Sequence, residues 1–542
     1  MTYFITGKFF LTPSFDIEVK EQEKITNFLR FLDSSGVGTI ISKYEKNTTS
    51  KGGRPNCNYY KLFATILYGF AFKCSTLREL EEACKFDLRF ITIMEQTKVD
   101  YTTICKFINK VIVPNEKEIF MLINKQIKKE ININFEDAFI DGTKFEANAN
   151  KYKFVWKPIT FHKRISIKIN EIITMYNLYE NYKCKELISS KIIANAMTNL
   201  SLKKGELLEE TFKNINLALS SMLQKVLEYE EKERICGPNR NSYYKTDHDA
   251  TAMCLKEDYY SGLGSNMHAA YNAQILVIKG FVFSYYVSQS RNDMNDFTAT
   301  LDYFYELYGE YPKNVCADSG YGSLKNYEYL KNNSIGNYVK YQTWEGNVTG
   351  RNPDCYVLNE DDTITCLNNL KGYETSLENR HPRKSNAVFY IVEGCQNCNF
   401  SPYCKKFMKI QNEDFKIFEI VKPLQRYKQE AAQNLLSTKG IEIRVNRSIQ
   451  VEGVFGVQKQ NYKNDRFRRR TLTKVSAEAM LNFLGFNIAK LFRYYENLTL
   501  NDYWIAPVDL TPQTFKKPSW KRLAKKGKRV NQNTYKNETN KK

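Results

Sequence analysis

Apolar residues recur at helical spacing through the first quarter of the chain. The longest apolar run, from Leu62 to Phe72, is too short to cross a membrane and therefore predicts a buried helix. Thr76 and Glu79 have the spacing of a capping box ahead of the next helix, and Asp100 can cap the one after it. We therefore expect an all-α N-terminal domain. Two of its helices fit a helix-turn-helix, and an ordinary helical bundle fits equally well.

Strand-like patterns follow. Asp141 and Asp318 each end a short apolar run and precede a glycine by one or two residues, which is typical of a buried strand reaching its carboxyl end. Between them, residues 271–289 are rich in β-branched and aromatic residues. Lys279 and Gly280 lie at the centre of this segment, so we predict a β-hairpin.

Three further segments differ from this α/β pattern. Residues from about 160 to 235 alternate charged and apolar positions, which predicts an exposed helical hairpin or short coiled coil inserted into the core. The segment 341–440 has a looser pattern. Residues 515–542 carry eleven basic residues and one acidic residue with little apolar content, so we expect a disordered basic tail.

Composition restricts the class of partner and compartment. The 80 lysines and arginines outnumber the 60 aspartates and glutamates, which gives a net charge of +20 and favours a polyanionic partner, first of all nucleic acid. A soluble protein that is merely rich in lysine is the alternative. Most of the 13 cysteines are scattered singly, which indicates reduced thiols and a cytoplasmic location. We see no secretory signal and no membrane-spanning run, and expect no membrane association.

One group of cysteines is denser than the rest. Cys395 and Cys398 form a Cys-x-x-Cys pair, and with Cys366 and Cys404 they would make a tetrahedral Zn²⁺ site. Cys355 could replace Cys366 as the fourth ligand. Free reduced thiols in a loop and redox chemistry are the other interpretations of the same spacing.

Three acidic residues are the candidate catalytic group: Asp141, Asp318 and Glu452. Each single carboxylate is more often a surface residue, but the strand-end contexts of the two aspartates favour one divided site. Carboxylates from two strand ends and one helix can hold two Mg²⁺ ions about 3.5–4 Å apart, as enzymes of phosphoryl displacement do. We therefore predict phosphodiester chemistry.

Basic residues follow Glu452. Lys459 lies two helical turns later, on the same helical face, and could hold a DNA phosphate or form a weak exposed ion pair. Gly453 and Gly456 interrupt the same helix, which close backbone approach to a strand or to DNA would explain. A cluster suited to phosphate contacts comes next, although such a run can also be a solvated surface: Arg466, Arg468, Arg469 and Arg470.

Several separated motifs resemble the DDE transposases of bacterial insertion sequences. They are DGTKFEANANKYKFVWK, DHDAT with YNAQ, ADSGYGS and RSIQVEGVFGVQKQNYKNDRFRRR, preceded by GRPNCNYYKLFATILYGF and STLRELEEAC. The likeness covers roughly residues 20–495. It implies a ribonuclease-H-like catalytic core, two Mg²⁺ ions per active site, and cleavage followed by strand transfer of the element's ends.

The resemblance assigns roles residue by residue. Asp141, Asp318 and Glu452 match the catalytic, metal-binding triad, and Lys459 matches the lysine of a Tyr-Arg-Glu-Lys signature. Arg447 stands beside Ser448, which holds the place of the signature arginine, and is the candidate for contact with the DNA end. For His248, between Asp247 and Asp249, we favour a loop or capping role over a second metal site.

The expected organisation has six parts. They are a helical DNA-binding domain at 1–131, core segments at 132–159 and 240–340, a helical insertion at 160–239, a Cys-rich insertion at 341–440, the C-terminal part of the core at 441–500 and a basic tail at 501–542. Expected partners are double-stranded DNA, as terminal inverted repeats and target, and a second copy of the chain, in the bacterial cytoplasm at the nucleoid. A metal-dependent nuclease without strand transfer and a non-catalytic, transposase-derived DNA-binding protein are the rivals.

Overall fold

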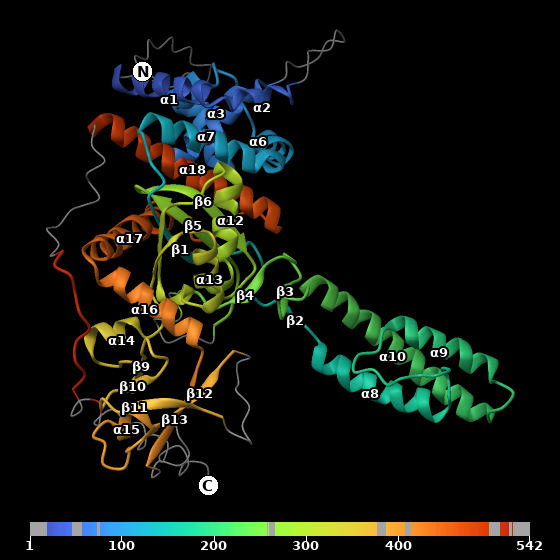
Figure 1. The fold of residues 1–542 in the computed structure, drawn as a ribbon. Helices are drawn as coiled ribbons and strands as arrows, with labels where there is room; N and C mark the ends of the chain where they lie inside the picture. The colour runs from blue at the N-terminus through green and yellow to red at the C-terminus, as the bar shows by residue number, and fades with distance from the viewer. Residues whose placement is uncertain are drawn as a thin grey trace, which may run out of the picture.

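The computed structural model describes residues 19–45, 57–72, 76–256, 258, 266–376, 386–406, 414–497, 510–519 and 523. The fold is mixed α/β, as predicted. Figure 1 shows N-terminal helices above a central sheet, a helical arm that projects to one side, and a second sheet at the opposite end from the N-terminal helices. No described helix combines the length and the apolar character needed to span a membrane.

The central sheet has the order β4-β5-β1-β7-β8, with β6 also paired to β5. Its strands are β1 (Asp137–Glu146), β4 (Thr251–Met253), β5 (His268–Ile278), β6 (Phe281–Ser288), β7 (Asn314–Ala317) and β8 (Gly336–Val339). β5 runs antiparallel to β1, β4 and β6, whereas β7 runs parallel to both β1 and β8. The predicted hairpin is confirmed as β5 and β6, and Lys279 and Gly280 form its turn with positive φ angles of 51° and 76°.

Helices cover this sheet: α12 (Phe297–Tyr308), α13 (Leu324–Asn332), α16 (Lys422–Leu436), α17 (Thr438–Gly456) and α18 (Leu472–Asn497). α17 packs against β1 and β7, α16 against β8 and α13, and α18 against β6. α16, which lies inside the expected Cys-rich insertion at 341–440, packs on the central sheet and also donates hydrogen bonds to residues 356–359 of that insertion. Short turns η3 (Asp293–Asn295) and η4 (Ser319–Tyr321) follow β6 and β7.

The N-terminal region is all-α, as predicted. It comprises α1 (Val19–Ser35), α2 (Gly38–Ser42), α3 (Tyr59–Ala71), α4 (Leu77–Phe86), α5 (Leu88–Ile93), α6 (Tyr101–Phe107), η1 (Ile108–Ile112), η2 (Val113–Asn115) and α7 (Glu116–Glu130). Both predicted caps are confirmed: Thr76 and Glu79 form a capping box at α4, and Asp100 accepts from the Thr103 N–H at α6. The predicted helix after Thr76 is divided at Asp87, which ends α4 and caps α5.

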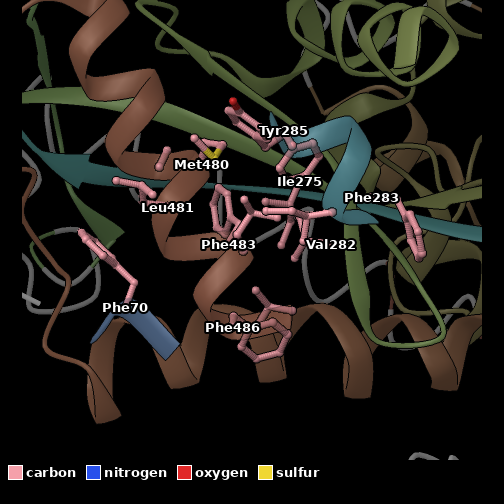
Figure 2. Packing of buried hydrophobic residues seen from close by; sticks show 14 of the residues in the cluster. Phe70, Ile275, Val282, Phe283, Tyr285, Met480, Leu481, Phe483 and Phe486 are labelled. Atoms are coloured by element: carbon pink, nitrogen blue, oxygen red, sulfur yellow. The ribbon is translucent and has the colours of Figure 1, made fainter. Parts of the chain in front are cut away.

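These helices share one hydrophobic core with the central sheet. Figure 2 shows Phe70 of α3 and Ile275 and Val282 of the hairpin packed around the aromatic side chains of α18. Asn487 of α18 donates to the side chain of Asn124 and accepts from the backbone of Val282, which joins α7, α18 and β6. The region 1–131 therefore does not have a core of its own in the described residues, and α18 holds it on the sheet.

The predicted helical insertion forms the projecting arm of Figure 1, with three helices in place of the two of a hairpin. These are α8 (Ile159–Met175), α9 (Ser190–Leu202) and α10 (Glu209–Cys236), and they bury a separate hydrophobic cluster. The short antiparallel pair β2 (Phe154–Trp156) and β3 (Ser242–Tyr244) forms the base of the arm. The insertion is therefore attached through two neighbouring strands.

The segment expected to be loose contains an antiparallel five-stranded sheet. Its strands are β9 (Tyr356–Leu358), β10 (Ile364–Cys366), β11 (Lys371–Thr375), β12 (Val388–Glu393) and β13 (Phe415–Ile420), flanked by α14 (Trp344–Thr349) and α15 (Ser401–Cys404). Part of the predicted disordered tail is also ordered. Gln513 and Lys516 donate backbone hydrogen bonds to Leu436 and Val348, and Phe515 packs edge-on against Trp344. Most of the remaining tail lies outside the described residues.

Candidate active site

Asp141 and Asp318 lie at neighbouring parallel strands. Pairing of β1 with β7 ends at Ile140 and Ala317, and each aspartate is the next residue along the chain. The Asp141 carboxylate accepts from the N–H of Gly142 at 2.9 Å, and Asp318 caps η4 by accepting from the N–H of Ser319 at 2.7 Å. The register of the parallel pair therefore brings these two carboxylates side by side. The predicted strand end is correct for Asp318 but wrong for Asp141, because β1 continues to Glu146 in its pairing with β5.

Asp141 has an unusual electrostatic environment. Burial raises the pKa of Asp141 to about 6, the Arg447 guanidinium opposes this shift, and the charges of Asp318 and Asp293 add to it. Arg447 lies on α17, and its Nη1 is 3.4 Å from Asp141 Oδ2. The site thus holds a half-buried carboxylate that is only partly neutralised by its surroundings, and this favours binding of a cation.

Glu452 is exposed on α17. Within the residues that the structure describes, no group of three or more His, Cys, Asp or Glu side chains is arranged to hold a metal ion. The structure therefore brings two members of the predicted trio to one sheet edge and places the third on a helix that packs against both strands.

Arg447 and Lys459, which are predicted to contact DNA, each contact another part of the protein in this structure. Arg447 is 8% exposed and faces Asp141. Lys459 donates to the backbone oxygen of Lys144 at 3.0 Å and lies over the ring of Phe145. α17 ends at Gly456 and continues as the π-helical turn η5 (Val457–Asn461), so the regular spacing assumed between Glu452 and Lys459 is interrupted. Lys459 fastens this turn to β1.

The arginine cluster lies in a loop whose backbone is held by carboxylates. Glu478 accepts from the N–H groups of Arg468 and Arg469 at 2.9–3.1 Å. Asp247 and Asp249, from the DHDAT stretch, accept from the N–H groups of Thr471 and Leu472 at the start of α18. His248 lies in a turn, which agrees with the loop role expected for it, and packs edge-on against Tyr243, whereas the two flanking aspartates make the contacts to the N–H groups.

Side chains of the arginine loop differ in their contacts. Arg469 donates to Asn109 of the N-terminal helices, and Arg470 donates to the backbone oxygen of Asn148 after β1. Arg466, Arg468 and Arg470 are exposed. Because Glu478, Asp247 and Asp249 hold the backbone of the loop and of the start of α18, the guanidinium groups project from a backbone of fixed conformation.

Two residues of this region were not predicted as site residues. Gln274 of β5 pairs with Gly142 and is fully buried, and its amide donates to Asp293 Oδ1 at 3.0 Å. Asp293, in η3, also accepts from Asn272 at 2.6 Å. The sequence signal for Gln274 was the YNAQ motif, whereas Asp293 lies in a polar turn without a distinctive pattern. A cavity of about 330 Å³ beside them is lined by Gly142, Thr143, Lys144, Cys254, Leu255, Lys256 and Asp293.

The predicted zinc ligands lie at one end of the five-stranded sheet, because β9 begins where β10 and β12 end. A hydrogen bond between Cys404 and Cys355 lowers the pKa of Cys355 and raises that of Cys404. Burial raises the pKa of Cys395, and the charges of Cys398 and Cys366 add to this shift. Each of the five thiols therefore lies near at least one other, but no three of them are arranged to hold a metal ion within the described residues.

Two family models match the chain. A transposase DDE domain matches residues 365–492, which include Glu452, Lys459 and the arginine loop, and a transposase domain (DUF772) matches residues 15–110 in the N-terminal helices. Comparison with curated proteins and with solved structures found no match. DDE transposase domains use divalent metal ions and act on DNA. Two separate matches to transposase domains, one on each side of the Asp141 and Asp318 strand pair in the sequence, support a DDE transposase of an insertion sequence.

Proposed function

We propose that the protein binds the ends of its insertion sequence, cleaves them, and joins the resulting 3′ ends to target DNA. The observation that carries this proposal is the position of Asp141 and Asp318 side by side, on β1 and directly after its parallel neighbour β7, in a chain that matches a transposase DDE domain. Carboxylates placed in this way supply the oxygen ligands that Mg²⁺ prefers.

The topology of the central sheet supports a ribonuclease-H-like core. In the strand order β6-β5-β1-β7-β8, only β5 runs opposite to the others. The first aspartate lies on the central strand and the second follows the neighbouring one, which is the arrangement that the resemblance implies. Helix α17, which packs on these two strands, carries the glutamate.

In this proposal Asp141, Asp318 and Glu452 hold the divalent ions. The donor set fits, because the half-buried Asp141 carboxylate is incompletely neutralised and Asp318 contributes a second negative charge beside it. Bound Mg²⁺ would activate the attacking oxygen and stabilise the leaving oxygen of a phosphodiester. Glu452 is exposed on α17, the helix that packs on both strands.

The protein's own residues position the DNA. Arg447 lies beside Asp141 and is placed to balance the charge of a phosphate that approaches this carboxylate. The cavity beside Gly142, with Lys144 and Lys256 in its lining, gives room for a DNA strand next to the carboxylates. The arginine loop would contact more distant phosphates. The net charge of +20 would attract the DNA as a whole.

A cleavage and strand-transfer assay tests this function. Full-length protein is mixed with duplex DNA that carries the element's terminal repeats, labelled at the transferred 3′ end, and with a target plasmid in Mg²⁺. We expect cleavage and joined products with wild-type protein. Asp141→Asn, Asp318→Asn and Glu452→Gln should each abolish both products while they retain DNA binding, because each removes a ligand charge and little bulk.

Glu306→Gln is the matched control, because Glu306 is an exposed carboxylate on α12 that pairs with Lys117 on the surface. Its activity should equal that of the wild type. Cleaved ends that are never joined would favour the rival nuclease. Near-normal cleavage by any of the three triad variants would remove that residue from the proposed triad.

A further inference from the structure

The backbone pairing that brings Asp141 and Asp318 together stops just before them. The last paired residues of β1 and β7 are Ile140 and Ala317. Beyond this point Asp141 stays paired with Ile275 of β5, whereas Asp318 follows the end of β7. The pairing of β1 with β7 therefore does not by itself fix the separation of the two carboxylates.

Gln274 makes a further contact on the β1 side. It lies opposite Gly142 in the β1–β5 pair, and its amide occupies the space that a side chain at position 142 would fill. A Cβ at position 142 would overlap the amide nitrogen and oxygen of Gln274. The glycine after Asp141 therefore allows a buried amide to pack directly on the backbone next to this carboxylate.

The same amide is connected to the Asp318 side. Tyr321 donates its hydroxyl hydrogen to Gln274 Oε1, and Tyr321 is the last residue of the turn that Asp318 caps. This turn is held in place by Asn326, whose side chain donates to the Tyr321 backbone oxygen at 2.8 Å. One side-chain bridge thus links the segments that carry the two aspartates.

The other end of the amide is also fixed. Gln274 Nε2 donates to Asp293 Oδ1 at 3.0 Å and to Asn272 Oδ1 at 3.3 Å. Acceptors on its nitrogen and a donor on its oxygen determine the orientation of the amide. Gln274 and Tyr321 are both at most 1% exposed, so water does not compete for these hydrogen bonds.

We propose that Gln274 is a positioning residue that sets the separation of Asp141 and Asp318 through its hydrogen bond with Tyr321. The inference rests on the proposed function, because it assigns a support to the metal-binding pair of that function. Gln274 and Tyr321 contact neither metal nor DNA in this assignment. Supporting residues of this kind commonly change metal affinity or activity about 10–100-fold when they are removed.

Direct Mn²⁺ binding to the full-length protein tests this role, with free Mn²⁺ measured by electron paramagnetic resonance in the absence of DNA. Tyr321→Phe removes one hydroxyl group and keeps the buried ring. We expect it to raise the Mn²⁺ dissociation constant about 10–100-fold while the thermal transition stays that of a folded protein. Gln274→Met, which keeps similar volume without the amide, should have the same effect.

Tyr308→Phe is the matched control. Tyr308 also donates a hydrogen bond inside the core, to the backbone oxygen of Phe283, which is remote from the segments that carry the carboxylates. Weaker Mn²⁺ binding in Tyr321→Phe but not in Tyr308→Phe supports the inference. Unchanged affinity in a folded Tyr321→Phe protein, or equal weakening in both variants, overturns it.

The same titration separates this inference from the proposed function. Wild-type protein should lose its Mn²⁺ site when Asp141→Asn or Asp318→Asn is introduced. Binding that is identical in wild type and in both of these variants contradicts the metal-binding pair itself, and the positioning role with it. Loss in the aspartate variants together with unchanged binding in Tyr321→Phe overturns only the positioning role.

Discussion

At the scale of single residues, acidic side chains organise the basic loop after α17. Glu478, Asp247 and Asp249 take up backbone N–H groups of the loop and of the start of α18. Charge-assisted hydrogen bonds of this type are about twice as strong as neutral ones. Because the carboxylates bind the backbone, the conformation of the loop depends little on the arginine side chains.

This arrangement makes the arginine loop a favourable target for substitution. We expect a variant with Arg468→Ala, Arg469→Ala and Arg470→Ala to stay folded, because the carboxylates still hold the loop backbone. Its binding to element ends should weaken, and the log–log slope of affinity against salt should fall by about 0.9 for each phosphate that the variant no longer neutralises. Fluorescence anisotropy over a salt series measures both quantities.

Lys213→Ala on α10 provides the control, since Lys213 is an exposed cation that pairs with Glu209 far along the arm. It should leave the slope unchanged. A folded triple variant with the slope of the wild type would show that the loop is a solvated surface that does not bind phosphates.

At the scale of elements, α17 is distinguished by its two glycines, Gly453 and Gly456. A Cβ at either position would meet no atom within 4 Å among the described residues. Close approach of a strand, one of the two explanations that the sequence left open, therefore does not account for them. Approach of DNA to the helix beside Glu452 remains the explanation we favour.

Substitution of both glycines tests this explanation. Gly453→Ala with Gly456→Ala should raise the free energy of unfolding by up to about 1 kcal/mol per site, because alanine favours helix and meets no neighbour. Cleavage of element ends should nevertheless fall, because the new methyl groups would stand where DNA approaches. Denaturant unfolding and the cleavage assay measure the two effects.

Gly485→Ala on α18 is a control that should lower the free energy of unfolding instead of raising it. A Cβ at Gly485 would lie 2.5 Å from the backbone oxygen of Phe70, so the variant should lose about 1–3 kcal/mol of stability. Normal cleavage by a stabilised Gly453→Ala, Gly456→Ala protein would contradict the proposed approach of DNA to these two glycines.

The five-stranded sheet leads to a prediction about its cysteines. If Cys395 and Cys398 bind zinc with two of the neighbouring thiols, purified protein should contain about one Zn²⁺ per chain. Cys395→Ser with Cys398→Ser should lose the metal and destabilise this sheet, because metal binding is coupled to folding. Elemental analysis after purification without chelators gives the stoichiometry.

The isolated Cys105→Ser on α6 is the control and should keep the metal. Absence of zinc from the wild-type protein would favour the other interpretation, that these cysteines are free reduced thiols. Variants of Cys355 and Cys366, made singly, would identify the fourth ligand by loss of zinc.

At the scale of the whole molecule, the arm is the most separable part. Its hydrophobic cluster contains no residue of the central core, and its polypeptide leaves and re-enters through the paired strands β2 and β3. By contrast, the N-terminal helices share their core with α18 and the sheet. The two regions should therefore respond differently to deletion.

Replacement of residues 159–236 by a short Gly-Ser linker should leave the core folded, because β2 and β3 can pair across the new turn. We expect the Mn²⁺ affinity of the Asp141 and Asp318 pair to stay within about twofold of the wild type, since the arm supplies none of the contacts described for it. Removal of residues 1–131 should instead give insoluble protein, because it exposes the face of α18 shown in Figure 2. Unfolding of the core after truncation of the arm would contradict the separation of the arm's hydrophobic cluster from the central core.

Local sequence signals determined several features of this protein by themselves. The helix caps at Thr76 and Asp100, the hairpin turn at Lys279 and Gly280, and the buried helix after residue 58 all depend on neighbouring residues and formed as predicted. Asp141 and Asp318 were singled out by a local pattern, an apolar run followed by glycine, which marks a strand end correctly for Asp318 but not for Asp141, because β1 continues to Glu146.

Contacts between distant segments were decided only by the tertiary structure. The sequence could not show that α16 covers β8, that three helices form the arm, or that part of the basic tail packs on Trp344. It also gave no sign that Gln274 joins the turn after Asp318 to the strand of Asp141. These arrangements depend on which surfaces remain to be covered once the local elements have formed, and such surfaces combine residues hundreds of positions apart.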